Sequence, residues 1–176
     1  MIKELAEQLS HGNNLTIDQM TSVMDEILTG TQTDEDIAKF LKNLTEKGES
    51  DDELLAMLKK MEEYSLHISP NCKGKIIDVC GTGGDNLKTF NISTAASFVI
   101  AGAGGNVAKH GNRSISGVSG SADIFEYFGF DLNSEPNKVN ETIEKFGIGF
   151  MFAQKFHPAM KNVAKARKVV GGRTAF

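Results

Sequence analysis

The sequence has few prolines, few cysteines and no long hydrophobic run. Only three prolines occur among 176 residues, and 40% of the residues are hydrophobic, which favours a packed globular protein over a disordered one. The longest apolar stretch, FVIAGAG, is far too short to cross a bilayer. The first ten residues, MIKELAEQLS, form an amphipathic acidic pattern unlike a signal peptide. We therefore expect a cytoplasmic protein without a membrane partner.

The two cysteines, Cys72 and Cys80, do not have the spacing of a zinc site, because no second pair of ligands accompanies them. Free thiols in a reducing compartment are the expectation from this composition. The sequence pattern alone therefore predicts no zinc site.

Charge is distributed unevenly along the chain. Acidic residues outnumber lysines in residues 1–70, whereas no acidic residue follows Lys145. A basic stretch can bind nucleic acid, but these cations alternate with apolar residues at helical spacing and lack aromatic stacking platforms. We expect a small anionic ligand, or a merely solvated helix face, and no nucleic-acid partner.

Residues 1–70 have the pattern of four short amphipathic helices. The second, third and fourth are predicted to begin after Thr16, Thr33 and Ser50, which are favourable N-cap residues. Thr16 and Ser50 are each followed three residues later by Gln or Glu, as in a capping box. The predicted apolar stripe of the fourth helix comprises Leu54, Leu55, Leu58 and Met61. The sequence thus predicts a helical domain over residues 1–70.

After residue 70, short strands alternate with helices. KIIDVCG, NVAKHGNR and IGFMFA are the predicted strands, and NISTAASFVIAGAGG, SADIFEYFG, SEPNKVNETIEKFG and HPAMKNVAKARKVVG are the predicted helices. This order predicts an α/β domain over residues 71–176, with a mostly parallel sheet and crossover helices. We expect the terminal helix, residues 158–170, to pack near the helical domain.

Polar, glycine-rich segments follow the first two predicted strands, at Gly81–Asp85 and Lys109–Ser116. Ligands bind beyond the carboxyl ends of parallel strands, so both segments are predicted to meet at one site. The usual phosphate fingerprints are absent: no Walker loop is present, and Asn86 stands where a dinucleotide loop needs its third glycine. Each segment taken alone is also compatible with an ordinary turn.

The motifs GTGGD, NIST, KHGNRS, SGSAD and HPAMK…R…GGRT follow one another in this order. Together they resemble the anthranilate phosphoribosyltransferase family over the whole chain. The resemblance implies transfer of the phosphoribosyl group of 5-phosphoribosyl diphosphate (PRPP) to anthranilate, with Mg²⁺, in tryptophan biosynthesis. It also implies a homodimer joined through the helical domain. Pyrimidine nucleoside phosphorylases share the architecture without this set of motifs, and they define an alternative. A catalytically silent module for PRPP binding or dimerisation is another.

The resemblance also implies which residues bind the substrates. No side chain is assigned as a catalytic acid or base, because displacement of diphosphate from ribose depends mainly on positioning and charge neutralisation. The implied anthranilate residues are Gly81, Asn112 and Arg167, and the implied Mg²⁺ ligand is Ser93. The implied PRPP residues are Gly81, Gly84, Asp85, Thr89, Asn91, Ile92, Ser93, Thr94, Lys109, His110, Gly111, Asn112, Arg113, Ser114 and Ser121.

The chain also departs from the family pattern. Gly117 stands where the family commonly has serine, and the Asp-Glu pair that holds Mg²⁺ further along in the family is absent. The resemblance therefore implies a fold truncated relative to the family, and we expect the 176-residue chain alone to bind PRPP weakly and to turn over little anthranilate.

Overall fold

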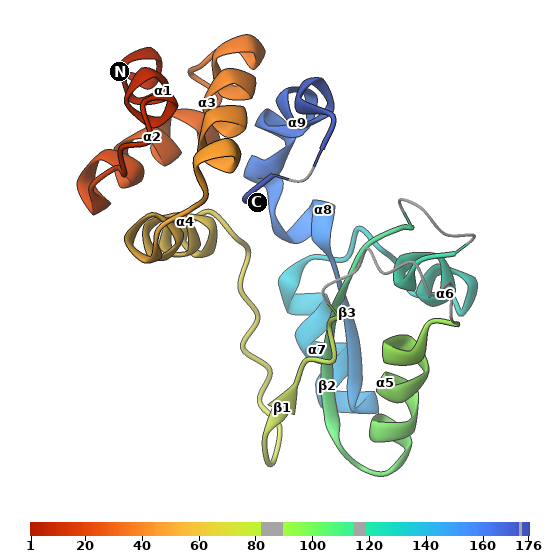
Figure 1. Ribbon diagram of the computed structural model, residues 1–176. Helices are drawn as coiled ribbons and strands as arrows, with labels where there is room; N and C mark the ends of the chain where they lie inside the picture. Colours follow the sequence, from red (N-terminus) through yellow and green to blue (C-terminus); the bar gives the residue numbers. More distant parts are fainter. Residues whose placement is uncertain (82–89, 115–118, 173) are drawn as a thin grey trace. The chain divides into compact units, whose positions relative to one another are not determined.

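The second, third and fourth helices begin after the residues predicted to cap them. The computed structural model describes residues 1–81, 90–114, 119–172 and 174–176 (Figure 1). The helices are α1 (Ile2–Ser10), α2 (Ile17–Leu28), α3 (Asp34–Lys47) and α4 (Asp51–Glu63). Thr16 and Ser50 form capping boxes, and the Thr33 hydroxyl accepts a hydrogen bond from the third backbone N–H of α3. These predicted helix starts are confirmed.

The buried face of α4 differs from the prediction. Leu54, Leu55 and Leu58 are 45%, 42% and 65% exposed, so the predicted leucine stripe does not face the core. The buried residues of this helix are instead Glu53, Ala56, Met57 and Lys60. The rotation of α4 follows from Glu53, whose side chain is tied both to the helix start and to the connection before α2. Polar contacts, rather than the leucines, set which face of α4 is buried.

Glu53 is fully buried and its carboxylate has three partners. It accepts hydrogen bonds from the backbone N–H groups of Leu15 and Ser50 at 2.8 and 2.7 Å, and from Lys47 Nζ at 2.8 Å. Burial by itself raises the pKa of Glu53, but the hydrogen bonds from Leu15, Lys47 and Ser50 outweigh this and hold the pKa below its usual value of 4.5. The charged carboxylate is therefore part of the folded state.

Glu53→Gln is expected to lower the free energy of unfolding by about 1.5 kcal/mol near neutral pH. Because the pKa of Glu53 is depressed, the stabilisation by its charged carboxylate is complete above the usual pKa of 4.5. It is lost as pH falls through the lower pKa of the folded state. The difference between the two proteins should therefore shrink on acidification. Urea unfolding followed by far-ultraviolet circular dichroism at several pH values measures it, with the exposed Glu62→Gln as control. A loss that stays constant with pH would contradict the charge-based explanation.

The last twenty residues pack with the first four helices. The structure forms two units, Met1–Ser65 with His157–Phe176, and Leu66–Phe156. The predicted continuous helix over 158–170 is wrong, because a 3₁₀ turn, η1 (Pro158–Asn162), precedes α9 (Ala164–Val170). The turn places the Asn162 amide so that it donates to the Leu28 carbonyl oxygen at 2.8 Å.

Gly30 makes this contact possible at the end of α2. Its φ is +75°, and a Cβ there would lie 3.0 Å from the Asn162 side chain. Val163 and Ala166 complete the same apolar core as the buried residues of α1 to α3. The helical unit therefore consists of segments from both ends of the chain.

The second unit is built on a parallel sheet of order β1-β2-β3. Its elements are β1 (Ile76–Ile77), α5 (Ile92–Gly102), β2 (Asn106–Gly111), α6 (Ser121–Tyr127), α7 (Pro136–Phe146), β3 (Ile148–Phe152) and α8 (Ala153–Phe156). The register pairs Ile77 with Val107, and Val107 with Ile148. The predicted parallel sheet with crossover helices is confirmed.

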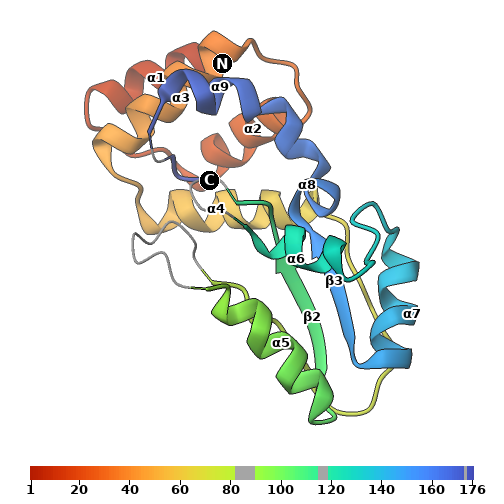
Figure 2. The same cartoon turned by 90° about the vertical axis from the view of Figure 1, so that its right-hand side faces the viewer.

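Apolar residues alternate between the two faces of this sheet. Val107 packs with Phe125 and Phe150 in one core cluster, whereas the next residue, Ala108, packs with Val139 and Ile143 of α7 in another. Figure 2 accordingly shows α5 and α7 flanking the sheet. Among the described residues, no helix combines the length and apolar character needed to span a membrane.

Candidate active site

The carboxyl end of β1 lies beside the start of α5. A Cβ placed on Gly81 would lie 3.6 Å from Ser93 Oγ, so the two predicted substrate residues are close. Asn91 is the N-cap of α5 but makes no side-chain capping bond, and Thr94 is buried in the first turn. Helix N-termini attract anions because their first N–H groups lack partners within the helix. This corner of the sheet can therefore receive a phosphate.

Lys109 is a buried cation on the neighbouring strand. The structure extends β2 through Gly111, so Lys109, His110 and Gly111 belong to the strand and not to the loop in which the sequence placed them. Lys109 is 3% exposed, and its Nζ donates to the His110 carbonyl oxygen at 2.6 Å. Within the described residues no carboxylate forms a salt bridge with it. Because burying an ammonium group is costly, this cation is suited to an anionic ligand.

The loop after β2 packs closely against the start of α6. The Asn112 carbonyl oxygen accepts from the Ala122 backbone N–H at 3.1 Å and from Ser121 Oγ at 3.4 Å. Asn112 Oδ1 accepts from the Arg113 backbone N–H at 2.8 Å. At Gly111, an added Cβ would lie 2.1 Å from Ser121 Oγ. The structure thus brings together Asn112, Ser121 and the end of β2.

Arg113 is engaged by two carboxylates of α6. Its Nη1 donates to Asp123 at 2.7 Å and to Glu126 at 2.8 Å, and its Nη2 donates to Glu126 at 2.9 Å. The hydrogen bonds to Glu126 and Asp123 raise the pKa of Arg113. Both acids have a lowered pKa, Asp123 through the Gly120 N–H and Arg113, and Glu126 through Arg113. The guanidinium therefore anchors this loop to α6.

Two acidic residues of this site were missed by the sequence reasoning. Asp78 Oδ1 accepts from the backbone N–H groups of Cys80 at 2.9 Å and His110 at 3.2 Å, which ties the end of β1 to β2. Asp123 accepts from the Gly120 N–H and from Arg113. Their positions inside the DVCGTGGD and SGSAD motifs were the available signal.

The structure describes only some of the remaining predicted residues. Gly84, Asp85 and Thr89 are outside the described residues. Ile92 is exposed in the first turn of α5, and Ser114 ends the described part of the loop after β2. Arg167 belongs to the helical unit, is exposed on α9, and donates through Nε to Thr174 Oγ1 at 3.1 Å.

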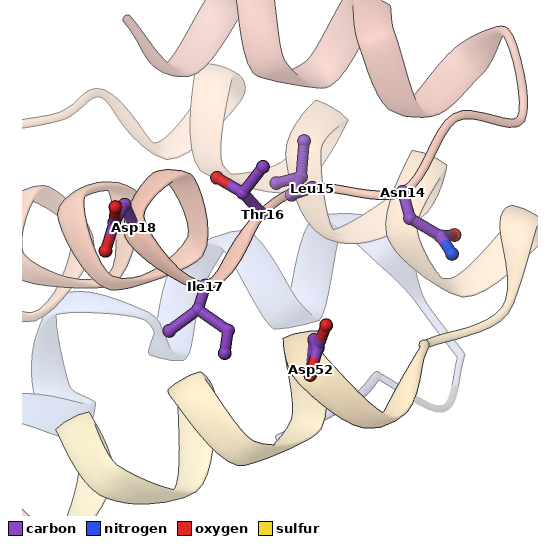
Figure 3. Close-up of a pocket in the computed structure, with 6 residues that line it drawn as sticks. All are labelled: Asn14, Leu15, Thr16, Ile17, Asp18 and Asp52. Atoms are coloured by element: carbon purple, nitrogen blue, oxygen red, sulfur yellow. The ribbon is translucent and has the colours of Figure 1, made fainter.

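A pocket of about 570 Å³ lies in the helical unit, between the α1–α2 connection and α4 (Figure 3). Its lining residues are Asn14, Leu15, Thr16, Ile17, Asp18 and Asp52. These include two carboxylates but no cation and none of the predicted substrate residues. The pocket therefore contributes nothing to a phosphate site.

Comparison with known families finds two domain models along the chain. Residues 3–65 match the helical bundle domain of a glycosyl transferase family, and residues 73–176 match the a/b domain of the same family. The chain belongs to this glycosyl transferase family. The family match covers the helices α1 to α4, the sheet, and every residue predicted to bind substrate.

The relatives that this chain resembles are named anthranilate phosphoribosyltransferases. The chain is 65% identical over its entire length to the one from Nitrosopumilus maritimus, covering 51% of that protein, and 44% identical to the one from Persephonella marina, covering 52%. The chain thus spans about half the length of these relatives.

Solved structures of anthranilate phosphoribosyltransferases share the fold of this chain. The Thermus thermophilus enzyme superposes with a TM-score of 0.86 at 38% identity, over 97% of this chain and 52% of that one. The Saccharomyces cerevisiae enzyme in complex with PRPP and Mg superposes with a TM-score of 0.85 at 25% identity, over 99% of this chain and 52% of that one. The expected family and fold class are confirmed.

Proposed function

We propose that the protein acts in anthranilate phosphoribosyl transfer, converting anthranilate and PRPP to N-(5-phosphoribosyl)anthranilate and diphosphate in tryptophan biosynthesis. The observation that carries the proposal is Lys109, a buried cation at the carboxyl edge of a parallel sheet that has no salt bridge to any described carboxylate, in a chain 65% identical to a protein of that name. An anionic ligand there would compensate a charge that the fold has largely removed from water.

The reaction places specific demands on this edge of the sheet. Breaking the bond between ribose C1 and diphosphate creates positive character on the sugar and negative charge on the leaving group. Lys109, the N–H groups of α5 and the hydroxyls of Ser93 and Thr94 are suited to that negative charge. Gly81 keeps the adjacent backbone free of a side chain. These residues would hold PRPP and stabilise the departing diphosphate.

Mg²⁺ fits this site only together with the substrate. The Ser93 hydroxyl is a hard oxygen ligand, and Mg²⁺ in such sites takes one or two protein oxygens plus phosphate oxygens. When bound, the ion would neutralise part of the diphosphate charge. We therefore propose that Ser93 helps to hold a magnesium–PRPP complex, and that Ser93 alone retains no free ion.

The acceptor side is proposed to use Asn112 and Arg167. Arg113 already shares its guanidinium between Glu126 and Asp123, so we assign it to holding the Asn112 loop and not to contacting phosphate directly. Arg167 has only the Thr174 hydroxyl as a described partner, which leaves most of its donors for a substrate carboxylate.

A product assay separates this function from the alternatives. The chain should be tested both alone and as a chimera in which residues 1–176 replace the matching half of the Nitrosopumilus maritimus enzyme. Formation of phosphoribosyl anthranilate by the chimera supports the proposal. Cleavage of thymidine with phosphate would instead indicate a nucleoside phosphorylase. PRPP binding without either product would indicate a silent binding module.

We also propose that the protein is cytoplasmic and forms a homodimer through the helical unit. The exposed Leu54, Leu55 and Leu58 of α4 supply apolar surface that a second copy can cover. Sedimentation velocity measures this assembly directly, and a monomer at all concentrations would contradict it.

Arg167→Ala is expected to raise the anthranilate KM of the chimera about tenfold and to leave the PRPP KM nearly unchanged. A lost charge-assisted hydrogen bond at an exposed position is worth about 1.4 kcal/mol, which corresponds to that factor. Lys168→Ala, which removes an exposed cation from the next position of α9, is the matched control. Steady-state kinetics with each substrate varied in turn measures both constants. Equal effects of the two variants would reject the assignment of Arg167.

A further inference from the structure

Three side chains of the types that can bind metals lie close together near the ends of β1 and β2. Asp78 and Cys80 follow β1, and His110 lies on β2, so ligands separated by thirty residues converge. One donor atom from each lies within 4.8 Å of the other two. Among the described residues, this is the one group of three histidine, cysteine, aspartate or glutamate side chains whose donor atoms lie this close together. None of the three is assigned to a metal by the proposed reaction.

Backbone hydrogen bonds hold this arrangement in place. Asp78 Oδ1 accepts from the backbone N–H groups of both Cys80 and His110, so the carboxylate is tied to the backbone of the two residues that carry the other ligands. Asp78 and Cys80 are exposed, which gives an ion access from solvent. Burial lowers the pKa of His110, which disfavours the charged imidazolium, and the neutral imidazole is the form that binds metals.

We propose that Asp78, Cys80 and His110 form a binding site for one divalent ion of the zinc class, with water in the remaining position. A thiolate, an imidazole and a carboxylate are a typical zinc donor set, and a thiolate disfavours Mg²⁺. Zinc bond lengths of about 2.0–2.3 Å require donor atoms about 3.5 Å apart, so small side-chain rotations close the site. On binding, the Cys80 thiol releases its proton to solvent and the sulfur becomes the ligand.

This site differs from the magnesium site proposed at Ser93. Magnesium there depends on hard oxygen ligands and on the phosphates of PRPP, whereas the ligands here include sulfur and nitrogen and need no substrate. The cysteine spacing argued against zinc because such a pattern requires several ligands close together in the sequence. The proposed site has only one cysteine, and its histidine comes from another strand.

Cobalt(II) titration of the 176-residue chain under anaerobic conditions tests the site. We expect one equivalent of Co²⁺ to bind, with a near-ultraviolet charge-transfer band from the thiolate, and Zn²⁺ to displace it. Cys80→Ser should abolish the band, whereas Cys72→Ser should retain it. His110→Gln and Asp78→Asn should weaken binding at least tenfold, and the exposed His67→Gln should not.

Circular dichroism of each variant checks that the fold is kept. If another variant unfolds, Cys80→Ser, which changes a single atom, remains the deciding test. Absence of the charge-transfer band in the unmodified chain would overturn the proposal. A band that persists in Cys80→Ser, or disappears in Cys72→Ser, would overturn it equally.

Discussion

Gly120→Ala is expected to weaken PRPP binding by the chimera more than 100-fold while the helical unit remains folded. A Cβ at position 120 would lie 2.3 Å from the Ser114 nitrogen and 2.6 Å from both the Arg113 carbonyl carbon and the Asn112 oxygen. These are backbone atoms, so no side chain can rotate to relieve the overlap. The φ of Gly120 is −93°, which alanine also adopts, so the effect is one of space alone.

The overlap has this consequence because it separates the loop after β2 from α6. Asn112 and Ser121 are predicted substrate residues. As the loop moved, the Asn112 carbonyl oxygen would lose its hydrogen bonds from Ser121 Oγ and from the Ala122 N–H. A displacement of about 1 Å is enough to impair a site whose work is positioning.

Calorimetry with PRPP and Mg²⁺ measures the effect of Gly120→Ala, and a 100-fold loss corresponds to about 2.7 kcal/mol. Gly102→Ala is the matched control, because a Cβ there meets nothing within 4 Å and the residue ends a helix of the same unit. Unchanged PRPP affinity in Gly120→Ala would show that the loop lies outside the site.

Local signals in the sequence were sufficient to predict α1 to α7 and the sheet, but not the 3₁₀ turn η1. The capping boxes at Thr16 and Ser50 depend on residues three positions apart, and both are formed. The rotation of α4 was not predictable in the same way, because Glu53 is held by the backbone of Leu15, far away in the sequence. In α4, hydrogen bonds and ion pairs accompany the burial of Glu53 and Lys60, and the leucines are exposed instead of facing the core.

The candidate site likewise combines features that local sequence predicts with contacts between distant residues that it does not predict. The glycine-rich segments and their place at strand ends were predicted from sequence, and β2 carries Lys109 to that edge. The sequence did not show that the Arg113 guanidinium is shared by Asp123 and Glu126, because both acids lie on another element. A cation is available to a ligand only if no acidic side chain of the folded protein already binds it. The spacing of residues along the sequence does not show such contacts.

Lys109→Met is expected to raise the PRPP dissociation constant of the chimera about thirtyfold without destabilising the fold. Loss of a charge-assisted contact to phosphate costs about 2 kcal/mol, which corresponds to that factor. Methionine keeps the length and apolar stem of lysine, and it fills the same buried space without a charge. Lys138→Met, on the exposed surface of α7, is the matched control.

The effects of Lys109→Met on PRPP affinity and on the free energy of unfolding distinguish a binding role of Lys109 from a structural one. The described partner of Lys109 Nζ is a carbonyl oxygen, and no salt bridge with a described carboxylate compensates the buried charge. Removing that charge should therefore leave the free energy of unfolding unchanged or raise it, since an uncompensated buried charge opposes folding. Calorimetry with PRPP and urea unfolding of the same variant give both values. A large loss of stability with normal PRPP affinity would mean that Lys109 serves the fold, and that the anion binds elsewhere.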